Sequence, residues 1–307
     1  MQTFLSADQF CSDGRKVSLA IGMFDGVHLG HQQVIRQAVT DAAQHEGVAV
    51  AVTFDQHPSR IVAPDRVPPL LYAPSQKMRA LAALGVDALL VIPFTQEFAA
   101  QPGDIFIRTL VEKLRPVHSI CVGSSFVFGH KRSGNVALLQ QLGRELAFAV
   151  HGLAAVALDG QKVSSTRLRE TIRAGDFATA AQMLGREYAL CGPVVTGDRL
   201  GRQLGFPTAN LDPEGRLVPP HGVYAAHAFV AGRRHRAALN IGVRPTLGQP
   251  APHLRIEAHL LNFEGDLYGQ EMELTFVKKL RDEIKFPSVE ALRLQIDLDL
   301  KAARASF

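Results

Sequence analysis

The chain has 307 residues, of which 47% are hydrophobic and 20% are charged, proportions that are ordinary for a globular protein of one large or two smaller domains. The formal net charge of +4 divides almost evenly between the halves, and a nucleic-acid partner would require a concentrated basic stripe. No apolar run approaches the roughly 20 residues that span a bilayer, so we expect neither a nucleic-acid nor a membrane partner.

The first half alternates short apolar runs with amphipathic stretches. Strands are predicted at 17–24, 48–54, 87–94, 119–123 and 147–158. Helices are predicted at 74–85, 102–114 and 135–146. A further helix is predicted between the first two strands, because its apolar residues fall on one helical face: Val34, Ile35, Ala38, Val39 and Ala42. Nearly continuous apolar strands between helices are typical of a parallel sheet that is covered on both faces. We therefore expect a doubly wound α/β domain.

The pattern changes after residues 164–185, which predict two short helices, so we place a domain boundary between 184 and 185. Beyond Tyr188 the apolar residues alternate with period two, which predicts antiparallel strands in a closed barrel or a sandwich. In 253–263 one face carries Leu254, Ile256, Ala258 and Leu260, and the other carries Arg255, Glu257 and His259. A hairpin is predicted at 222–242, with the basic run GRRHR (232–236) as its solvated tip, and a strand at 271–277. The end, 288–307, predicts a helix whose inward face carries Val289, Leu292, Ile296 and Leu300.

Three cysteines, Cys11, Cys121 and Cys191, are far apart and form no CxxC pair. This arrangement argues against a disulfide framework and a cysteine-based zinc site, and it fits a reducing cytoplasm. Each cysteine is expected to be a small core residue. The first residues show no basic stretch followed by an apolar core, so we expect no signal peptide and a cytoplasmic protein.

The segment GMFDGVHLGHQQ (22–33) directly follows the first predicted long strand. A helix that begins around His31 would direct unpaired N–H groups and its positive dipole end toward an anion, and His28 and His31 could bind a phosphate there. The spacing also suits a metal, with His57 as the nearest further ligand, and the histidines could equally be incidental to a capped helix start. The sequence contains no GxxxxGK[ST] or GxGxxG loop, so the P-loop and dinucleotide interpretations lack support.

Several segments, in order and spacing, resemble a known family. GMFDGVHLGHQ, TFDQHP, VGSSFVFGHKRSG and VSSTRLR are similar to the adenylyltransferase module of bacterial FAD synthetases, and HLGH resembles the HxGH element of the wider nucleotidylyltransferase superfamily. GPVVTGDRLGRQLGFPTANL, PPHGVYA, NIGVRPT, IEAHLLNFEGDLYG and LRDEIKF resemble the riboflavin kinase module that follows it in those proteins. The resemblance implies a Rossmann-like nucleotidylyltransferase domain over 1–184 and an antiparallel β-barrel kinase domain with a C-terminal helix over 185–307.

For the first domain, the resemblance implies transfer of AMP from ATP to FMN, with release of pyrophosphate. His28 and His31 would bind the ATP phosphates and stabilise charge at the transferring phosphorus. The remaining ATP and phosphate contacts would come from Gly22, Phe24, Gly30, His57, Arg132, Ser164, Ser165, Thr166 and Arg169. Flavin contacts would come from Ser125, Phe126 and Phe128. The family more often has Asp or Asn at Ser125 and Pro at Gln56, and the first departure bears on FMN affinity or nucleotide discrimination.

For the second domain, the resemblance implies transfer of the γ-phosphoryl group of ATP to the ribityl hydroxyl of riboflavin. Thr208 and Asn210 would hold Mg²⁺, and Glu257 would be the general base, although a strand glutamate is otherwise usually a solvated surface residue. A loop over the ATP phosphates would comprise Gly197, Gly201, Arg202 and Gly205. Arg281 is a further candidate for nucleotide contact, with a surface ion pair as the alternative.

We therefore expect a two-step enzyme that converts riboflavin to FMN and FMN to FAD, with riboflavin, FMN, ATP and Mg²⁺ as its small-molecule partners. One alternative is a riboflavin kinase whose first domain is weak or acts on another substrate. A second is a flavin-binding regulatory module without turnover, which would need neither metal ligands nor a base. The sequence gives no oligomeric state.

Overall fold

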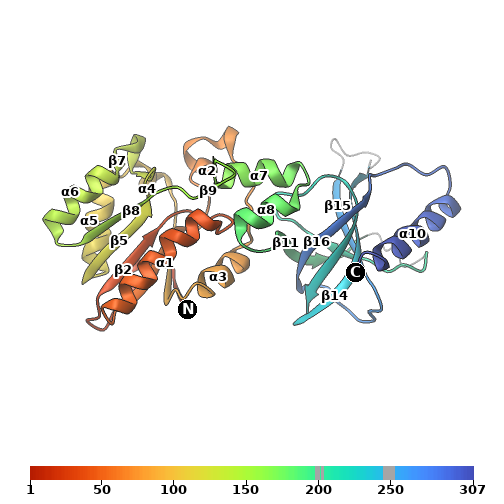
Figure 1. Cartoon of the computed structure of the whole chain (residues 1–307), viewed down its shortest axis with the longest axis horizontal. Coiled ribbons are helices and arrows are strands. Elements are labelled where there is room, and N and C mark those ends of the chain that lie inside the picture. The colour runs from red at the N-terminus through yellow and green to blue at the C-terminus, as the bar shows by residue number, and fades with distance from the viewer. Residues whose placement is uncertain (198–200, 202–203, 245–252) are drawn as a thin grey trace. The chain divides into compact units, whose positions relative to one another are not determined.

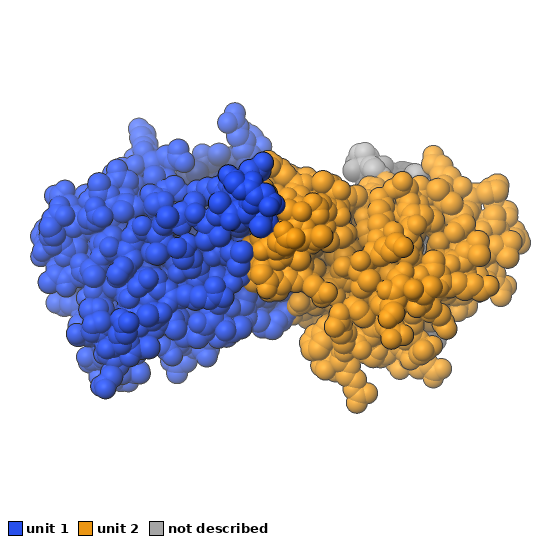
Figure 2. Space-filling model, in the orientation of Figure 1, with its two compact units in different colours: residues 1–70, 74–165 blue, residues 71–73, 166–307 orange. Residues whose placement is uncertain are grey.

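A computed structural model describes residues 1–197, 201, 204–244 and 253–307 (Figure 1). The chain forms two compact units, residues 1–70 with 74–165 and residues 71–73 with 166–307, coloured separately in Figure 2. Each unit has its own sheet system and its own buried core.

The first unit contains a six-stranded sheet in which every neighbouring pair is parallel. Its strand order is β1 (Gln2–Phe4), β4 (Ala88–Ile92), β3 (Val48–Phe54), β2 (Val17–Ile21), β5 (Val117–Gly123) and β8 (Ala149–Leu153). The expected doubly wound α/β domain is confirmed. The sequence missed β1, which is too short to show a pattern, and the predicted strand at 147–158 is instead β8 followed by β9 (Ala157–Leu158).

The two faces of this sheet carry side chains of different size. Large aliphatic residues such as Leu19 and Val50 pack with α5 (Gly103–Lys113) and α6 (Val136–Leu146) in one core cluster. The residues between them in sequence are small and point to the other face, on which α1 (Leu29–Gln44) packs against β2, β3 and β5. They are Ser18, Ala20, Ala49, Ala51, Ser119 and Cys121. Small side chains let a helix approach a sheet closely, so α1 can pack closely against this face.

Shorter elements complete the first unit. They are α2 (Ser59–Val62), α3 (Pro74–Ala82), α4 (Gln96–Ala100), β6 (Val127–Phe128), β7 (Gly134–Asn135) and β10 (Gln161–Lys162), with 3₁₀ turns at Ala7–Gln9, Pro64–Arg66 and His130–Arg132. Cys121 is fully buried, as predicted, but Cys11 is exposed, because it lies in the loop before β2 rather than on a core-facing strand. The prediction of a core position for Cys11 is therefore wrong.

The second unit is a closed barrel of antiparallel strands, which decides between the two predicted architectures. Around the barrel the order is β11 (Ala189–Val195), β12 (Ala209–Leu211), β15 (His253–Leu260), β14 (Arg233–Arg244), β13 (Gly222–Val230) and β16 (Glu271–Arg281). It follows α7 (Ser165–Arg173) and α8 (Phe177–Leu184), the two short helices that the sequence predicts. Cys191 is buried in β11.

Two predictions about the barrel need correction. The hairpin turn consists of Ala231 and Gly232, so only the first residue of the basic run lies in it. The other four residues of the run begin β14, and most of them are exposed. In the last helix, α10 (Val289–Arg304), Leu300 and Ala303 pack on the barrel and Ile296 joins them, but Val289 is 55% exposed because the first turn extends beyond that contact. No helix in the described part of the chain is both long and apolar enough to cross a membrane.

Candidate active sites

The two histidines of HLGH lie at the start of α1, where their rings stack. His28 is the residue before the helix, and its Nδ1 accepts the backbone N–H of His31 at 3.3 Å. The ring centroids are 3.7 Å apart with a 17° angle between planes, and Phe24 contacts His31 edge-on. The helix thus begins two residues earlier than predicted. Its N-terminal amides and both imidazoles come together at one place, which favours an anion.

His31 is neutral in this arrangement. Burial lowers its pKa well below the usual value, and the neighbouring charges of His28 and Lys77 lower it further. Its Nδ1 is buried without a hydrogen-bond partner among the described residues. A buried polar atom of this kind costs free energy unless a ligand or water pairs with it. The negative charge of a bound polyphosphate would also favour the protonated ring, so the site is suited to an anion of that class.

Lys77 on α3 is a cationic residue of this site that the sequence analysis missed. Its Nζ donates to the carbonyl oxygen of Met23 at 3.1 Å and lies 3.5 Å from Oγ1 of Thr53. Burial lowers the Lys77 pKa, and the charge of Asp25 opposes that shift. Met23 and Thr53 lie at the carboxyl ends of β2 and β3, where doubly wound sheets bind their ligands. A lysine within an amphipathic helix carries no local signal of such a role.

Gly22, Phe24 and Gly30 shape the turn that carries the histidines. A Cβ at Gly22 would lie 2.9 Å from the Phe24 ring, and one at Gly30 would lie 3.2 Å from the His28 ring. Phe24 is 1% exposed and adopts a φ of 51°, a left-handed conformation that costs about 1–3 kcal/mol in a non-glycine residue. The turn is therefore a strained and closely packed support for the two imidazoles.

The predicted SST element meets this turn through Ser165. Its hydroxyl donates to the carbonyl oxygen of Asp25 at 3.0 Å, within the first unit, which also contains Ser164. Thr166 and the buried Arg169 lie in the part of α7 that belongs to the second unit. Within the first unit, Ser165 is thus the member of the element that fixes the histidine turn.

An aromatic cavity of about 590 Å³ forms a second feature of the first unit. Phe126 and Phe128 line it with their rings stacked at 5.1 Å, and Arg132 lines it beside His130 and Lys131. The other aromatic lining residues, which were not predicted from the sequence, are Phe54, Phe94, Phe98 and Phe106. Apolar ring walls with a basic rim suit a flat aromatic ligand that carries a phosphate.

Two predicted residues are absent from the lining of the aromatic cavity. The Ser125 hydroxyl accepts a hydrogen bond from Nζ of Lys162 at 3.0 Å. His57 uses Nδ1 to accept the backbone N–H of Ser59 at 3.1 Å, while its neighbour Pro58 does line the cavity. Neither Ser125 nor His57 lines the cavity, although each is adjacent in sequence to a residue that does.

In the second unit a cavity of about 560 Å³ brings together Gly197, Thr208 and Asn210. Glu264 and Asp266, which the sequence analysis did not select, line the same cavity. Hydroxyl, amide and carboxylate oxygens are the donors that Mg²⁺ prefers, so this set fits that ion.

Glu257 is the direct cross-strand neighbour of Asn210, because β15 pairs with β12 at this position. Its carboxylate is half-buried and lies 3.7 Å from the Arg255 guanidinium. Glu257 does not itself line the 560 Å³ cavity. Paired residues of an antiparallel ladder project from the same face, so the predicted base and the predicted metal ligand are adjacent.

The glycines of the predicted phosphate loop pack against these residues. A Cβ at Gly197 would overlap the Asn210 amide, and one at Gly201 would meet the Phe206 carbonyl and the Thr208 hydroxyl. Gly205 adopts a φ of 89°, which favours glycine. Arg202 lies outside the described residues.

Arg281 forms an ion pair, the alternative given to it above. Its Nε and Nη2 donate to the two carboxylate oxygens of Asp299 on α10, at 2.8 and 2.6 Å. Asp299 is buried and also accepts from Gln295. The guanidinium therefore anchors the last helix to β16.

Comparison with known proteins assigns both units. Residues 11–167 match the family model described as FAD synthetase, and residues 184–307 match riboflavin kinase. The bifunctional riboflavin kinase/FMN adenylyltransferases of Haemophilus influenzae and Escherichia coli K12 are 38% and 36% identical, each over 94% of this chain and 94% and 92% of their own length. A crystal structure titled macrolide-efflux protein, from Streptococcus pneumoniae, is 27% identical, with a TM-score of 0.84 over 99% of both chains. With both domains matched in this order, the chain belongs to the bifunctional riboflavin kinase/FMN adenylyltransferase family.

Proposed function

We propose that residues 1–184 adenylylate FMN and that residues 185–307 phosphorylate riboflavin, with particular residues in the roles given below. The observation that carries the first assignment is the stacked histidine pair, in which a buried, neutral His31 has an unpartnered nitrogen at a helix N-terminus. The adjacent pair Asn210 and Glu257 in the barrel carries the second.

In adenylyl transfer, a phosphate oxygen of FMN attacks the α-phosphorus of ATP, and the bond to the leaving pyrophosphate breaks. His28, His31 and the ammonium of Lys77 supply donors and positive charge where the phosphates carry growing negative charge. Phe126 and Phe128 hold the isoalloxazine ring, and Arg132 at the rim pairs with its phosphate. No covalent enzyme intermediate is required, because FMN is itself the nucleophile.

In the kinase step, the Glu257 carboxylate accepts the proton of the ribityl hydroxyl as its oxygen attacks the γ-phosphorus and ADP leaves. Thr208 and Asn210 would hold Mg²⁺, which neutralises charge on the ATP phosphates. The glycine loop positions these ligands, because Gly197 and Gly201 pack directly on Asn210 and Thr208.

The Ser125 departure has a limited consequence in this proposal. Its hydroxyl is bonded to Lys162, and the flavin-facing surface is made by aromatic rings instead. We therefore propose that the first domain retains FMN adenylylation. A first domain that is weak or acts on another substrate is the alternative outcome of the assay below.

The substrates are riboflavin, FMN and ATP, without a nucleic-acid partner. We place the reaction in the cytoplasm, where ATP is supplied and where cysteines such as the exposed Cys11 stay reduced.

The test is a product assay on the purified chain with Mg-ATP and either riboflavin or FMN, followed by chromatography. His31→Ala should abolish FAD formation and leave FMN formation intact, and Glu257→Ala should do the reverse. Glu273→Ala, a half-buried glutamate on β16 outside both sites, is the matched control and should retain both steps. FMN without FAD, even at high enzyme concentration, would exclude the adenylyltransferase, and loss of both steps in one folded variant would exclude two separate sites.

A further inference from the structure

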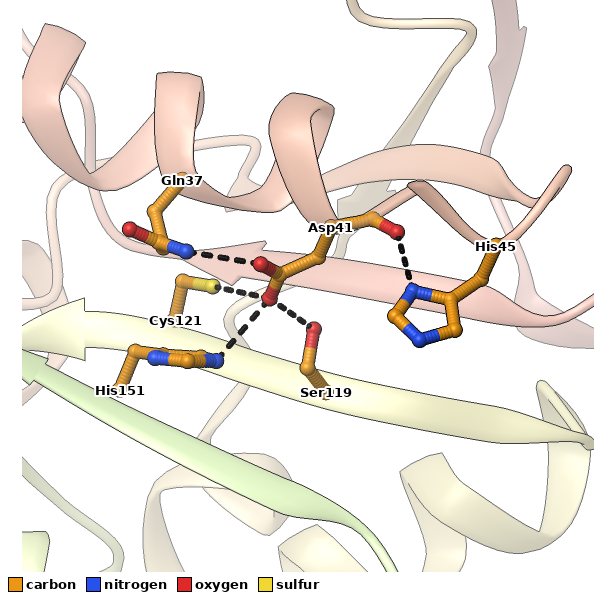
Figure 3. Close-up of polar contacts among 6 residues, drawn as sticks. All are labelled: Gln37, Asp41, His45, Ser119, Cys121 and His151. Carbon is orange, nitrogen blue, oxygen red and sulfur yellow. Dashed lines mark hydrogen bonds and ion pairs between the residues drawn. The ribbon is translucent and has the colours of Figure 1, made fainter. Parts of the chain in front are cut away.

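A compact polar cluster lies on the α1 face of the parallel sheet, in the first unit (Figure 3). Asp41 comes from α1, Ser119 and Cys121 from β5, and His151 from β8. Asp41 is 5% exposed, and Ser119 and Cys121 are fully buried. Neither flavin reaction uses these residues, so a buried carboxylate, thiol and imidazole share one place without an assigned role.

The donor atoms of this cluster converge on one carboxylate oxygen. Oδ2 of Asp41 lies 3.1 Å from Nε2 of His151 and 3.8 Å from Sγ of Cys121, and it accepts the Ser119 hydroxyl at 2.7 Å. The ligand atoms of Asp41, Cys121 and His151 all lie within 4.8 Å of one another. The other oxygen, Oδ1, accepts the side-chain amide of Gln37 at 2.7 Å, which fixes the orientation of the carboxylate.

We propose that Asp41, Cys121 and His151 form a binding site for a divalent cation of the zinc class. Tetrahedral zinc with ordinary bond lengths separates nitrogen from oxygen by about 3.3 Å and sulfur from oxygen by about 3.6 Å. The separations of 3.1 and 3.8 Å already lie within about 0.3 Å of these values. A mixed sulfur, nitrogen and oxygen set selects zinc over magnesium, which prefers oxygen donors alone.

The exposed side of the site supplies the entry path and the fourth ligand. The His151 side chain is 37% exposed, whereas that of Asp41 is 7% exposed, so a cation enters past the imidazole and keeps one water molecule. Binding converts the Cys121 thiol to a thiolate and releases its proton to solvent. Without the cation, burial and the Asp41 charge raise the pKa of this thiol, and a bound cation would lower it by stabilising the thiolate.

Neighbouring groups complete an outer shell. Gln37 and Ser119 hold the carboxylate as described, a feature of metal sites that tunes affinity. A register shift in β5 falls at His118, whose ring centroid lies 3.8 Å from that of His45 with the two planes tilted by 39°. Ser18, the register partner of Ser119, is 1% exposed, and its hydroxyl has no hydrogen-bond partner among the described residues. Ser18 thus adds an unsatisfied buried hydroxyl next to Ser119 on the neighbouring strand.

The site is remote from the histidine turn. Asp41 follows Leu29 by twelve residues on one helix, a distance of about 18 Å. β8 is an edge strand that pairs only with β5 in this sheet. A cation held by α1, β5 and β8 therefore acts as a clamp on the edge of the sheet rather than in adenylyl transfer.

The test is a cobalt titration of the full chain after metal removal with a chelator, read by thiolate-to-cobalt absorption. We expect about one Co²⁺ per chain, displaced by Zn²⁺. Cys121→Ser should abolish the thiolate absorption, and His151→Gln should weaken binding more than about 100-fold, since loss of an outer-shell partner alone typically costs 10–100-fold. Cys11→Ser removes the exposed cysteine and is the matched control, with unchanged binding. The proposed Mg²⁺ site has no sulfur donor and gives no such absorption.

Circular dichroism and FMN adenylylation report whether each variant is folded. If Cys121→Ser does not fold, His151→Gln decides the question, because its side chain is partly exposed and its replacement leaves the core intact. The proposal is overturned if the unmodified chain shows no thiolate absorption, if the absorption survives in Cys121→Ser, if it is lost in Cys11→Ser, or if folded His151→Gln binds as tightly as the parent.

Discussion

Gly197→Ala tests whether the glycine loop acts in the kinase through Asn210. A Cβ at this position would lie 2.6 Å from the amide carbon and 2.7 Å from the amide oxygen of Asn210, whereas ordinary contact begins at 3.4 Å. The amide nitrogen would lie closer still, so the amide must move by about 1 Å, and a misplacement of about 1 Å in a catalytic arrangement can cost about 100-fold in rate. We expect the kcat/KM for riboflavin phosphorylation to fall about 100-fold, equivalent to about 2.7 kcal/mol.

Stability should change little in the same variant. The atoms that must move are the end of one half-buried side chain, and Gly197 has no positive φ that alanine would strain. Alanine also restricts the unfolded chain, which offsets part of any cost by about 0.4–1 kcal/mol. Urea unfolding and FMN adenylylation on the same preparation should therefore match the parent protein.

A double-mutant cycle with Asn210→Ala separates this mechanism from a general disturbance of the loop. If Gly197→Ala acts through Asn210, the double variant should be no slower than Asn210→Ala alone, because the group to be displaced is already gone. A half-saturating Mg²⁺ concentration that rises in both single variants would agree with the proposed ligand role. Effects on kcat/KM that simply multiply in the double variant would refute the reasoning.

Three further outcomes are expected. Phe126→Ala should raise the KM for FMN about 2–10-fold, from loss of about 0.5–1.5 kcal/mol of ring contact, and should leave the KM for riboflavin unchanged; an equal rise in both would contradict the pocket assignment. Because burial lowers the His31 pKa below the 6.5 of the unfolded chain, the unfolded state binds more protons in acid, and stability decreases as the pH is lowered through that value. Urea unfolding at pH 7.5 and 5.5 should show that His31→Gln loses less stability than the parent, by up to about 1.4 kcal/mol, and equal losses would refute a buried neutral ring. Asp299→Ala removes the charged hydrogen bonds to Arg281 and should lower the free energy of unfolding, measured in urea, by about 1.5–3 kcal/mol. The KM of the kinase for ATP should not change, and a tenfold rise in that KM would indicate that Arg281 contacts the nucleotide.

Local sequence pattern determined most of the secondary structure. The uninterrupted apolar run at 48–54 became β3 with the same bounds, and the period-two alternation after Tyr188 became barrel strands. These outcomes follow from burial, because a strand covered on both faces must be apolar throughout and one covered on a single face must alternate. The HLGH spacing likewise predicted the histidines at a helix start, since His28 caps the helix it precedes.

The tertiary structure alone decided which distant residues meet. Six phenylalanines between residues 54 and 128 line one cavity, Lys77 reaches the ends of β2 and β3, and Asp41 meets Cys121 and His151. Composition and spacing could not show these meetings, and the lack of a CxxC pair argued against a zinc site that includes cysteine. The short-range periodicity of apolar residues indicates only whether a side chain is buried. The strand order and the packing of α1 on the sheet determine what covers it, and those depend on contacts across a hundred residues of chain.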